Sequence, residues 1–182
     1  MLLKTHYWAF PSALSADVCE LIIKEGNALK KEKAQAGGKV DPKIRKSEIS
    51  WFPHASWVKA IMLSHIHAAN NQAWGFNVHD AEQVQFTHYG LNEFYDIHFD
   101  AFELGEGMRK VSAVLQLSDP KTYEGGRLKL QNTYTSDFFE PPEMETRGSI
   151  VVFPSFLLHQ VTPVTKGDRY SAVAWATGPQ FR

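Results

Sequence analysis

The sequence predicts an α+β fold in which helices pack on one face of a β-barrel or β-sandwich. Two segments in the first half of the chain have helical periodicity, and six short segments in the second half alternate between polar and apolar residues. Glycine, proline, asparagine and aspartate separate these short segments, as is usual between strands. The 182 residues suit a single domain, 1–182, with helical support and the first strand in 1–75 and the β core in 76–182.

The first predicted helix runs from Ala16 to about Lys33, with Ser15 as its N-cap. Helical spacing places on one face of it Val18, Leu21, Ile22, Glu25 and Leu29. The polar segment Ala36–Lys46 contains two glycines and a proline, and it therefore predicts a mobile surface loop.

The alternation in Ser47–Phe52 predicts the first strand, and the pattern in Ala55–Trp74 predicts a second helix. The remaining alternating segments predict strands at Glu82–Tyr89, Lys110–Leu117, Gly126–Leu130, Ser149–Phe153, Leu157–Val161 and Tyr170–Ala176. Such a series of short strands after a helical start is what indicates the barrel or sandwich.

Composition and charge exclude several classes of protein. With 19 basic and 20 acidic residues, the chain has no basic excess that would indicate a nucleic-acid or anionic-membrane partner. No apolar run approaches the ~18 residues of a membrane span, and Met1–Phe10 has no leader pattern. The single cysteine, Cys19, excludes a disulfide framework and favours a reducing cytoplasm. The oligomeric state stays open, and a monomer is compatible with the sequence.

A possible metal site begins with the motif His98-x-Asp100. On a strand, residues two apart point to the same side, so both side chains could reach one ion. The motif alone is weak, because chance often produces it in a chain with 8 histidines. A third ligand is offered by His159, which lies in the apolar strand segment FLLHQV, although a lone strand histidine is more often structural.

The last predicted strand offers a place for a carboxylate. Alternation places on one of its faces Arg169, Ser171, Val173, Trp175 and Thr177. An arginine set among bulky apolar groups can hold a carboxylate through two parallel hydrogen bonds, although a surface ion pair is the ordinary alternative. The strand Glu82–Tyr89 likewise presents a polar face of Gln83, Gln85, Thr87 and Tyr89. Two histidines and one carboxylate suit non-haem Fe(II) or zinc, and the arginine favours iron with an organic co-substrate.

Several further motifs occur in a definite order and spacing. They are Arg45-Lys46-Ser47, Tyr89-x5-Tyr95-x2-His98-x-Asp100, Val111–Ser118 with Asp119-Pro120, Tyr123-x-Gly125-Gly126-x-Leu128, Gly148–Pro154, and His159-x-Val161-x-Pro163-Val164 leading through Arg169 to Trp175. With these motifs the chain resembles the Fe(II)- and 2-oxoglutarate-dependent dioxygenases, in particular their prolyl 4-hydroxylase branch. The resemblance covers roughly Arg45 to Thr177 and implies a double-stranded β-helix, or jelly-roll, core with the N-terminal helices on one face.

The resemblance also implies roles for individual residues. The metal ligands would be His98, Asp100 and His159, with Arg169 as the further catalytic-site residue that binds the distal carboxylate of 2-oxoglutarate. The other co-substrate contacts would come from Tyr89, Gln116 and Ser171. The substrate would face Tyr95, Arg109 and Trp175, with Lys110 as an alternative to Arg109. Gln116 departs from the family pattern, because some relatives have a second co-substrate tyrosine there, and Asn92 stands where glycine is common.

The implied activity is a cytoplasmic prolyl 4-hydroxylase that uses Fe(II), 2-oxoglutarate and O2, with ascorbate as a reductant, and forms succinate and CO2. A peptide or protein proline would be the substrate, and Ala36–Lys46 is then a candidate lid over it. Hydroxylation of a small molecule or free amino acid stays open. A non-catalytic binding module is the alternative from a different class. Nucleic-acid demethylation is disfavoured, because the chain has Trp175 where that branch carries a second arginine.

Overall fold

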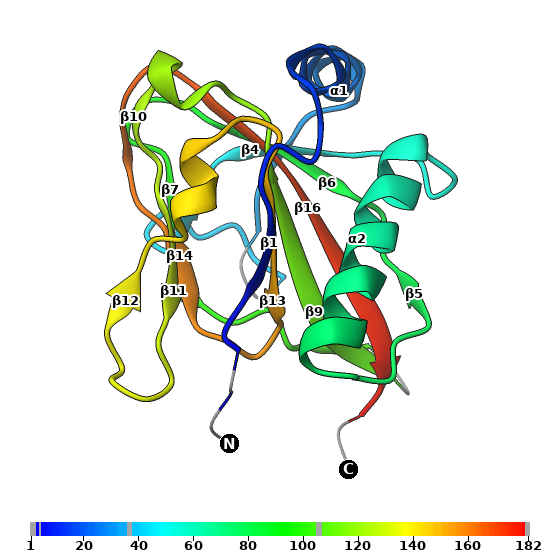
Figure 1. Ribbon diagram of the computed structural model, residues 1–182. Helices are drawn as coiled ribbons and strands as arrows, with labels where there is room; N and C mark the ends of the chain where they lie inside the picture. Colours follow the sequence, from blue (N-terminus) through cyan, green and yellow to red (C-terminus); the bar gives the residue numbers. More distant parts are fainter. Residues whose placement is uncertain (1–2, 4, 36–37, 105–106, 181–182) are drawn as a thin grey trace.

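The computed structural model describes residues 3, 5–35, 38–104 and 107–180, which form two facing β-sheets with helices on the outside (Figure 1). The helices are α1 (Ala16–Ala28) and α2 (Trp57–Ala73), with 3-10 turns at Pro120–Thr122 and Pro142–Glu145. The strands are β1 (Trp8–Phe10), β2 (Glu32–Lys33), β3 (Arg45–Lys46), β4 (Glu48–Trp51), β5 (Asp80–Ala81), β6 (Gln85–Tyr89), β7 (Phe94–His98), β8 (Glu103–Leu104), β9 (Gly107–Gln116), β10 (Glu124–Gly125), β11 (Leu128–Gln131), β12 (Phe138–Phe139), β13 (Ile150–Pro154), β14 (His159–Val161), β15 (Val164–Lys166) and β16 (Arg169–Pro179).

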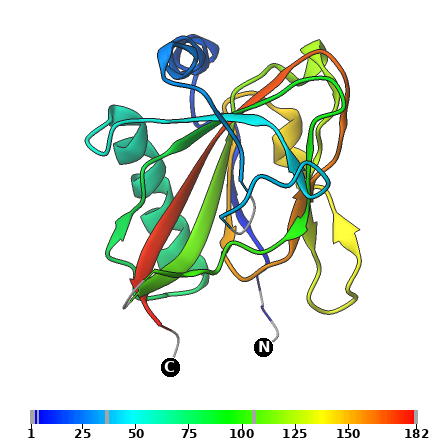
Figure 2. The ribbon, with the colours of Figure 1, turned by 180° about the vertical axis from the view of Figure 1, so that it is seen from behind.

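The larger sheet has 9 strands in the main order β1-β13-β9-β16-β6-β4-β2, with β5 paired to β16 and β8 to β9. The smaller sheet has 5 strands in the order β12-β11-β14-β7-β3, and β10 pairs separately with β15. Although β2 and β4 belong to the larger sheet, β3, which lies between them in the sequence, pairs with β7 in the smaller sheet (Figure 2). The described part of 1–75 therefore supplies β1, β2 and β3 to the sheets as well as the predicted first strand.

Both helices begin at serine N-caps and cover the outer face of the larger sheet (Figure 1). The Ser15 and Ser56 hydroxyls accept hydrogen bonds from the backbone N–H groups of Val18 and Lys59. Within the described residues, no helix is long and apolar enough to cross a membrane.

The first helix is shorter than the sequence predicted. It ends at Ala28 instead of about Lys33, because Glu32 and Lys33 pair as a strand with β4. Pairing with a distant strand overrides local helix propensity here. The predicted loop Ala36–Lys46 also needs correction, since its last two residues form β3, and its residues 36–37 lie outside the described residues.

Two apolar layers hold the fold together and separate the site from the helices. The outer layer packs helix residues such as Ile22, Met62 and Ile66 against the outward face of β9 and β16. The alternation predicted for the last strand is confirmed, because Ala172, Ala174 and Ala176 belong to this outer layer. The inner layer lies between the two sheets and contains Tyr89, Val114, Leu128, Leu130, Phe153, Leu157 and Val161. Any polar group on the inward face of β16 is consequently enclosed between the sheets.

Candidate metal and co-substrate site

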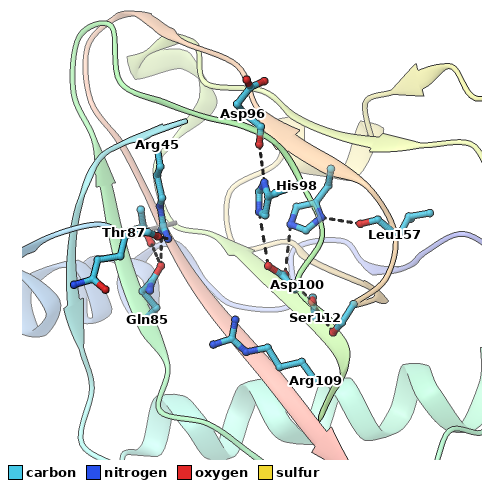
Figure 3. Close-up of polar contacts among 12 residues, drawn as sticks. Arg45, Gln85, Thr87, Asp96, His98, Asp100, Arg109, Ser112 and Leu157 are labelled. Atoms are coloured by element: carbon cyan, nitrogen blue, oxygen red, sulfur yellow. Dashed lines mark hydrogen bonds and ion pairs between the residues drawn. The ribbon is translucent and has the colours of Figure 1, made fainter. Parts of the chain in front are cut away.

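The three predicted metal ligands lie together between the two sheets (Figure 3). His98 ends β7 and is paired directly with His159, the first residue of β14. Asp100 lies just beyond the end of β7, and its backbone N–H donates to the Ser155 carbonyl at 2.7 Å. The Nε2 atoms of His98 and His159 lie 3.7 Å and 3.4 Å from the Asp100 carboxylate oxygens. All three ligand atoms fall within 4.8 Å of one another.

Neighbouring groups fix the direction in which each ligand points (Figure 3). The Nδ1 atom of His98 contacts the Asp96 carbonyl at 2.7 Å, and that of His159 contacts the Leu157 carbonyl at 2.9 Å. Because a carbonyl oxygen can only accept, both Nδ1 atoms carry the proton and both Nε2 atoms keep a free lone pair. The Ser112 hydroxyl donates to Asp100 Oδ2 at 2.8 Å. Such outer contacts are what hold metal ligands in position.

The protonation states also suit a metal. Burial, with the nearby His159 as the second cause, lowers the pKa of His98 to about 3, so its imidazole is neutral at ordinary pH. Burial alone would raise the pKa of Asp100, but in the metal-free site a protonated His159 next to the carboxylate would hold that pKa below its usual range. Ligand atoms at right angles around an ion ~2.1 Å away lie ~3 Å apart. The distances of 3.7 Å and 3.4 Å between the histidines and Asp100 are somewhat longer than this. The donor set therefore fits Fe(II) or another divalent ion.

Arg169 lies in the same small cavity as the triad. The cavity measures about 40 Å³, and its wall includes Tyr89, Ser171 and Trp175. Arg169 is 1% exposed, its Nη1 lies 3.5 Å from the Ser171 hydroxyl, and its Nη2 has no hydrogen-bond partner. A buried guanidinium with an unsatisfied N–H group is equipped to bind a carboxylate. The predicted inward face of the strand is correct for Arg169, Ser171, Val173 and Trp175, whereas the Thr177 hydroxyl bonds the Asp80 carbonyl.

Gly126 makes room for the arginine. Its φ is +59°, and a Cβ atom added there would lie 2.9 Å from Cδ of Arg169. A side chain at this position would therefore push against the aliphatic part of Arg169, which explains the second glycine of the Gly125-Gly126 motif.

Gln116 approaches Arg169 from a second cavity. This cavity measures about 180 Å³, and both residues line it together with Tyr123. The amide Nε2 of Gln116 donates to the Tyr123 hydroxyl at 2.8 Å and to the Ser118 carbonyl at 3.1 Å, while its Oε1 has no partner. The predicted co-substrate residues thus surround one guanidinium, but Gln116 does not line the cavity of the triad.

The three residues predicted to face the substrate line a larger outer cavity of about 380 Å³, which Asp100 also lines. The Arg109 guanidinium stacks 4.0 Å from the Trp175 ring and donates to both carboxylate oxygens of Glu82. A register shift opposite Ala176 and Thr177 leaves Lys110 as an extra residue in β9. This bulge turns Arg109 toward the cavity, while the Lys110 ammonium donates to the Pro179 carbonyl.

Arg45 is a buried charged residue that lines both cavities and to which the sequence assigned no role. Its guanidinium lies 4.4 Å from the centre of the Tyr95 ring and donates to Gln85 Oε1 at 2.6 Å (Figure 3). The motif Arg45-Lys46-Ser47 indicated it, but the predicted loop Ala36–Lys46 included Arg45 and Lys46, so the short strand β3 was not predicted. Gln85 lies on the predicted polar face of β6, whereas Gln83 lies before the strand and donates to the Phe52 carbonyl.

A family comparison gives this geometry a context. The model of the 2OG-Fe(II) oxygenase superfamily matches residues 84–177, which is more than half of the chain. The chain belongs to the 2OG-Fe(II) oxygenase superfamily. Members are named for the Fe(II) and 2-oxoglutarate that they use, so the predicted resemblance is confirmed.

Curated relatives match about half of the chain. A PKHD-type hydroxylase of Shewanella sp. (strain ANA-3) is 42% identical over 94 residues, and one of Thermosynechococcus vestitus is 39% identical over 94 residues. Each match covers 50% of this chain and 40% of the relative. The chain therefore spans well under half the length of these relatives.

Solved structures support the fold over nearly the whole chain. A prolyl 4-hydroxylase of Pseudomonas putida has a TM-score of 0.74 at 24% identity and covers 94% of this chain and 92% of its own. A prolyl hydroxylase of Trichoplax adhaerens, solved with a peptide fragment of hypoxia inducible factor, has a TM-score of 0.77 at 15% identity and covers 95% and 84%. The expected double-stranded β-helix is thereby confirmed.

Proposed function

We propose that this protein is an Fe(II)- and 2-oxoglutarate-dependent hydroxylase that acts on proline in a peptide or protein. One observation carries the proposal: a single buried cavity is lined both by His98, Asp100 and His159 and by Arg169. A zinc hydrolase would need the triad but not a buried arginine opposite it. Family membership adds the cofactors to this geometry.

Each residue of the cavity has a distinct task in this proposal. His98, Asp100 and His159 hold the ion, and Arg169, with the Ser171 hydroxyl beside it, holds the distal carboxylate of 2-oxoglutarate. Bound Fe(II) would supply the redox chemistry that couples oxidative decarboxylation of 2-oxoglutarate to hydroxylation. The remaining work of the protein is to orient both molecules and to exclude water.

The outer cavity is proposed as the substrate site. It shares Asp100 and Trp175 with the triad cavity, so a substrate bound there would lie beside the ion. Exposed residues, among them Lys33 and Phe102, form part of its wall, which leaves room for a chain that extends into solvent. The aromatic wall of Tyr95 and Trp175 suits the apolar ring of proline. A single catalytic domain and a cytoplasmic location belong to the same proposal, and a role for ascorbate stays a prediction.

The proposal is tested by measuring succinate formed from 2-oxoglutarate in the presence of Fe(II) and proline-containing peptides, with hydroxyproline detected by mass spectrometry. His98→Ala, Asp100→Ala and His159→Ala should abolish peptide-dependent succinate. Lys129→Gln, which removes a half-buried cation paired with Glu140, is the control and should retain the activity. Full turnover by the triad variants would contradict the metal assignment, and hydroxylation of free amino acids alone would contradict the peptide substrate.

A further inference from the structure

Arg45 is a buried cation that has only neutral partners. It is 7% exposed, and its Nη atoms donate to the Gln85 side-chain oxygen at 2.6 Å and to the Gln35 carbonyl at 3.2 Å. Its Nε–H has no hydrogen-bond partner. Among the described residues, no carboxylate forms an ion pair with Arg45. Burying a charge without an opposite charge is costly, so a missing anion is expected at this position.

Each of the other two arginines of the site has an anionic partner, either in the structure or in the proposed function. Arg109 binds both carboxylate oxygens of Glu82. In the proposed function, Arg169 binds the distal carboxylate of 2-oxoglutarate. The charges of Fe(II), the 2-oxoglutarate dianion, Asp100 and Arg169 then cancel, which leaves the charge of Arg45 uncompensated in the loaded site.

Arg45 lies where it can touch a substrate. It lines both the triad cavity and the outer cavity, and its guanidinium lies over the ring of Tyr95. The charged side chains at the rim of the outer cavity, Glu32 and Lys33, are exposed and opposite in sign, so they do not supply the missing anion.

Resting on the proposed function, we infer that Arg45 selects a substrate that carries a carboxylate next to the hydroxylated residue. For a polypeptide, this means a glutamate or aspartate beside the target proline. Gln85 supports this selectivity, because its neutral amide oxygen orients the guanidinium without cancelling its charge. A glutamate in place of Gln85 would provide that cancellation from within the protein.

The test uses two fluorescein-labelled peptides that differ only in having glutamate or glutamine on both sides of one proline. Binding is followed by fluorescence anisotropy in protein loaded with Mn(II) and 2-oxoglutarate, and succinate formation is followed separately with Fe(II). Wild-type protein should bind the glutamate peptide about tenfold more tightly than the glutamine peptide. Gln85→Glu and Arg45→Gln should both reduce this ratio to near one, and the KM for 2-oxoglutarate should change little.

The two variants complement each other, because Gln85→Glu keeps the Arg45–Tyr95 stacking that Arg45→Gln removes. Lys129→Gln, which removes a half-buried cation paired with Glu140, is the control and should keep the wild-type ratio. The inference is overturned if wild-type protein does not prefer the glutamate peptide, or if the preference survives in both variants. It is also overturned if Arg45→Gln weakens the binding of 2-oxoglutarate and leaves peptide binding unchanged. If the protein binds the glutamate peptide selectively but forms no succinate, the proposed hydroxylase activity is contradicted, whereas the carboxylate selectivity of Arg45 is supported.

Discussion

Replacing Arg169 with methionine should separate the stability of the fold from its affinity for 2-oxoglutarate. Arg169 is 1% exposed, its guanidinium lies 5.6 Å from the centre of the Tyr89 ring, and among the described residues its polar contacts are one weak hydrogen bond, at 3.5 Å to Ser171, with an unpaired Nη2. A buried cation with so few partners stabilises a fold little, and a residue of similar volume without charge is often neutral or stabilising by ~1–4 kcal/mol. Without 2-oxoglutarate, Arg169→Met should therefore unfold at the same temperature as wild type or a few degrees higher, since ~1 kcal/mol corresponds to ~2–4 °C at this chain length.

Addition of 2-oxoglutarate should stabilise the wild-type protein much more than the Arg169→Met variant. At a concentration of 100 times its Kd, 2-oxoglutarate should stabilise wild type by ~2.7 kcal/mol, or ~5–11 °C. Loss of one partner of a buried charge pair costs ~2–5 kcal/mol, so the variant should lose at least ~30-fold in affinity. Its stabilisation at the same concentration should then be at most ~0.9 kcal/mol, or ~2–4 °C. Differential scanning calorimetry with Mn(II) measures both effects. A variant that is clearly less stable than wild type, yet keeps the full 2-oxoglutarate shift, would refute the role of Arg169.

Two further predictions concern protons and backbone strain. In metal-free protein, the unfolded chain protonates His98 near its ordinary pKa of 6.5, whereas the folded chain does so only near about 3. Stability should therefore fall as pH decreases, by up to ~2 kcal/mol between pH 7 and pH 5 in urea unfolding. His98→Gln should have a shallower pH dependence, and an unchanged slope would count against burial of a neutral imidazole. Gly126→Ala should raise the KM for 2-oxoglutarate, because its Cβ would lie 2.9 Å from Cδ of Arg169. Gly75→Ala is the matched control, since Gly75 also has a positive φ but has nothing within 4 Å of the added Cβ. An equal effect on KM in both variants would show that backbone strain, and not contact with Arg169, is responsible.

The sequence was sufficient for the fold class and for the inward face of the last strand. Both depend on local periodicity, and burial on both faces of β16 follows the alternation that the sequence contains: alanines toward the helices and Arg169 and Ser171 toward the cavity. The positions of β2 and β3 could not be predicted, because each is two residues long and exists only through pairing with a distant strand.

The site could be predicted only in part for the same reason. His98 and His159 are separated in sequence and meet because β7 and β14 pair in a register, interrupted by a shift after His159, that sets the two histidines opposite each other. That register is not visible in either segment alone, so their meeting was implied by the family resemblance. The bulge at Lys110, which turns Arg109 into the cavity, and the burial of Arg45 against Tyr95 leave no periodic signal in the sequence.

Anaerobic titration of the protein with Fe(II) and 2-oxoglutarate tests most directly whether the triad and Arg169 form one site. We expect a visible charge-transfer absorption band only when Fe(II) and 2-oxoglutarate are both present. The band should be absent in His159→Ala, and it should require much more 2-oxoglutarate in Arg169→Met. No band in the wild-type protein, together with tight binding of zinc, would contradict an Fe(II)/2-oxoglutarate site and favour a hydrolase or a binding protein.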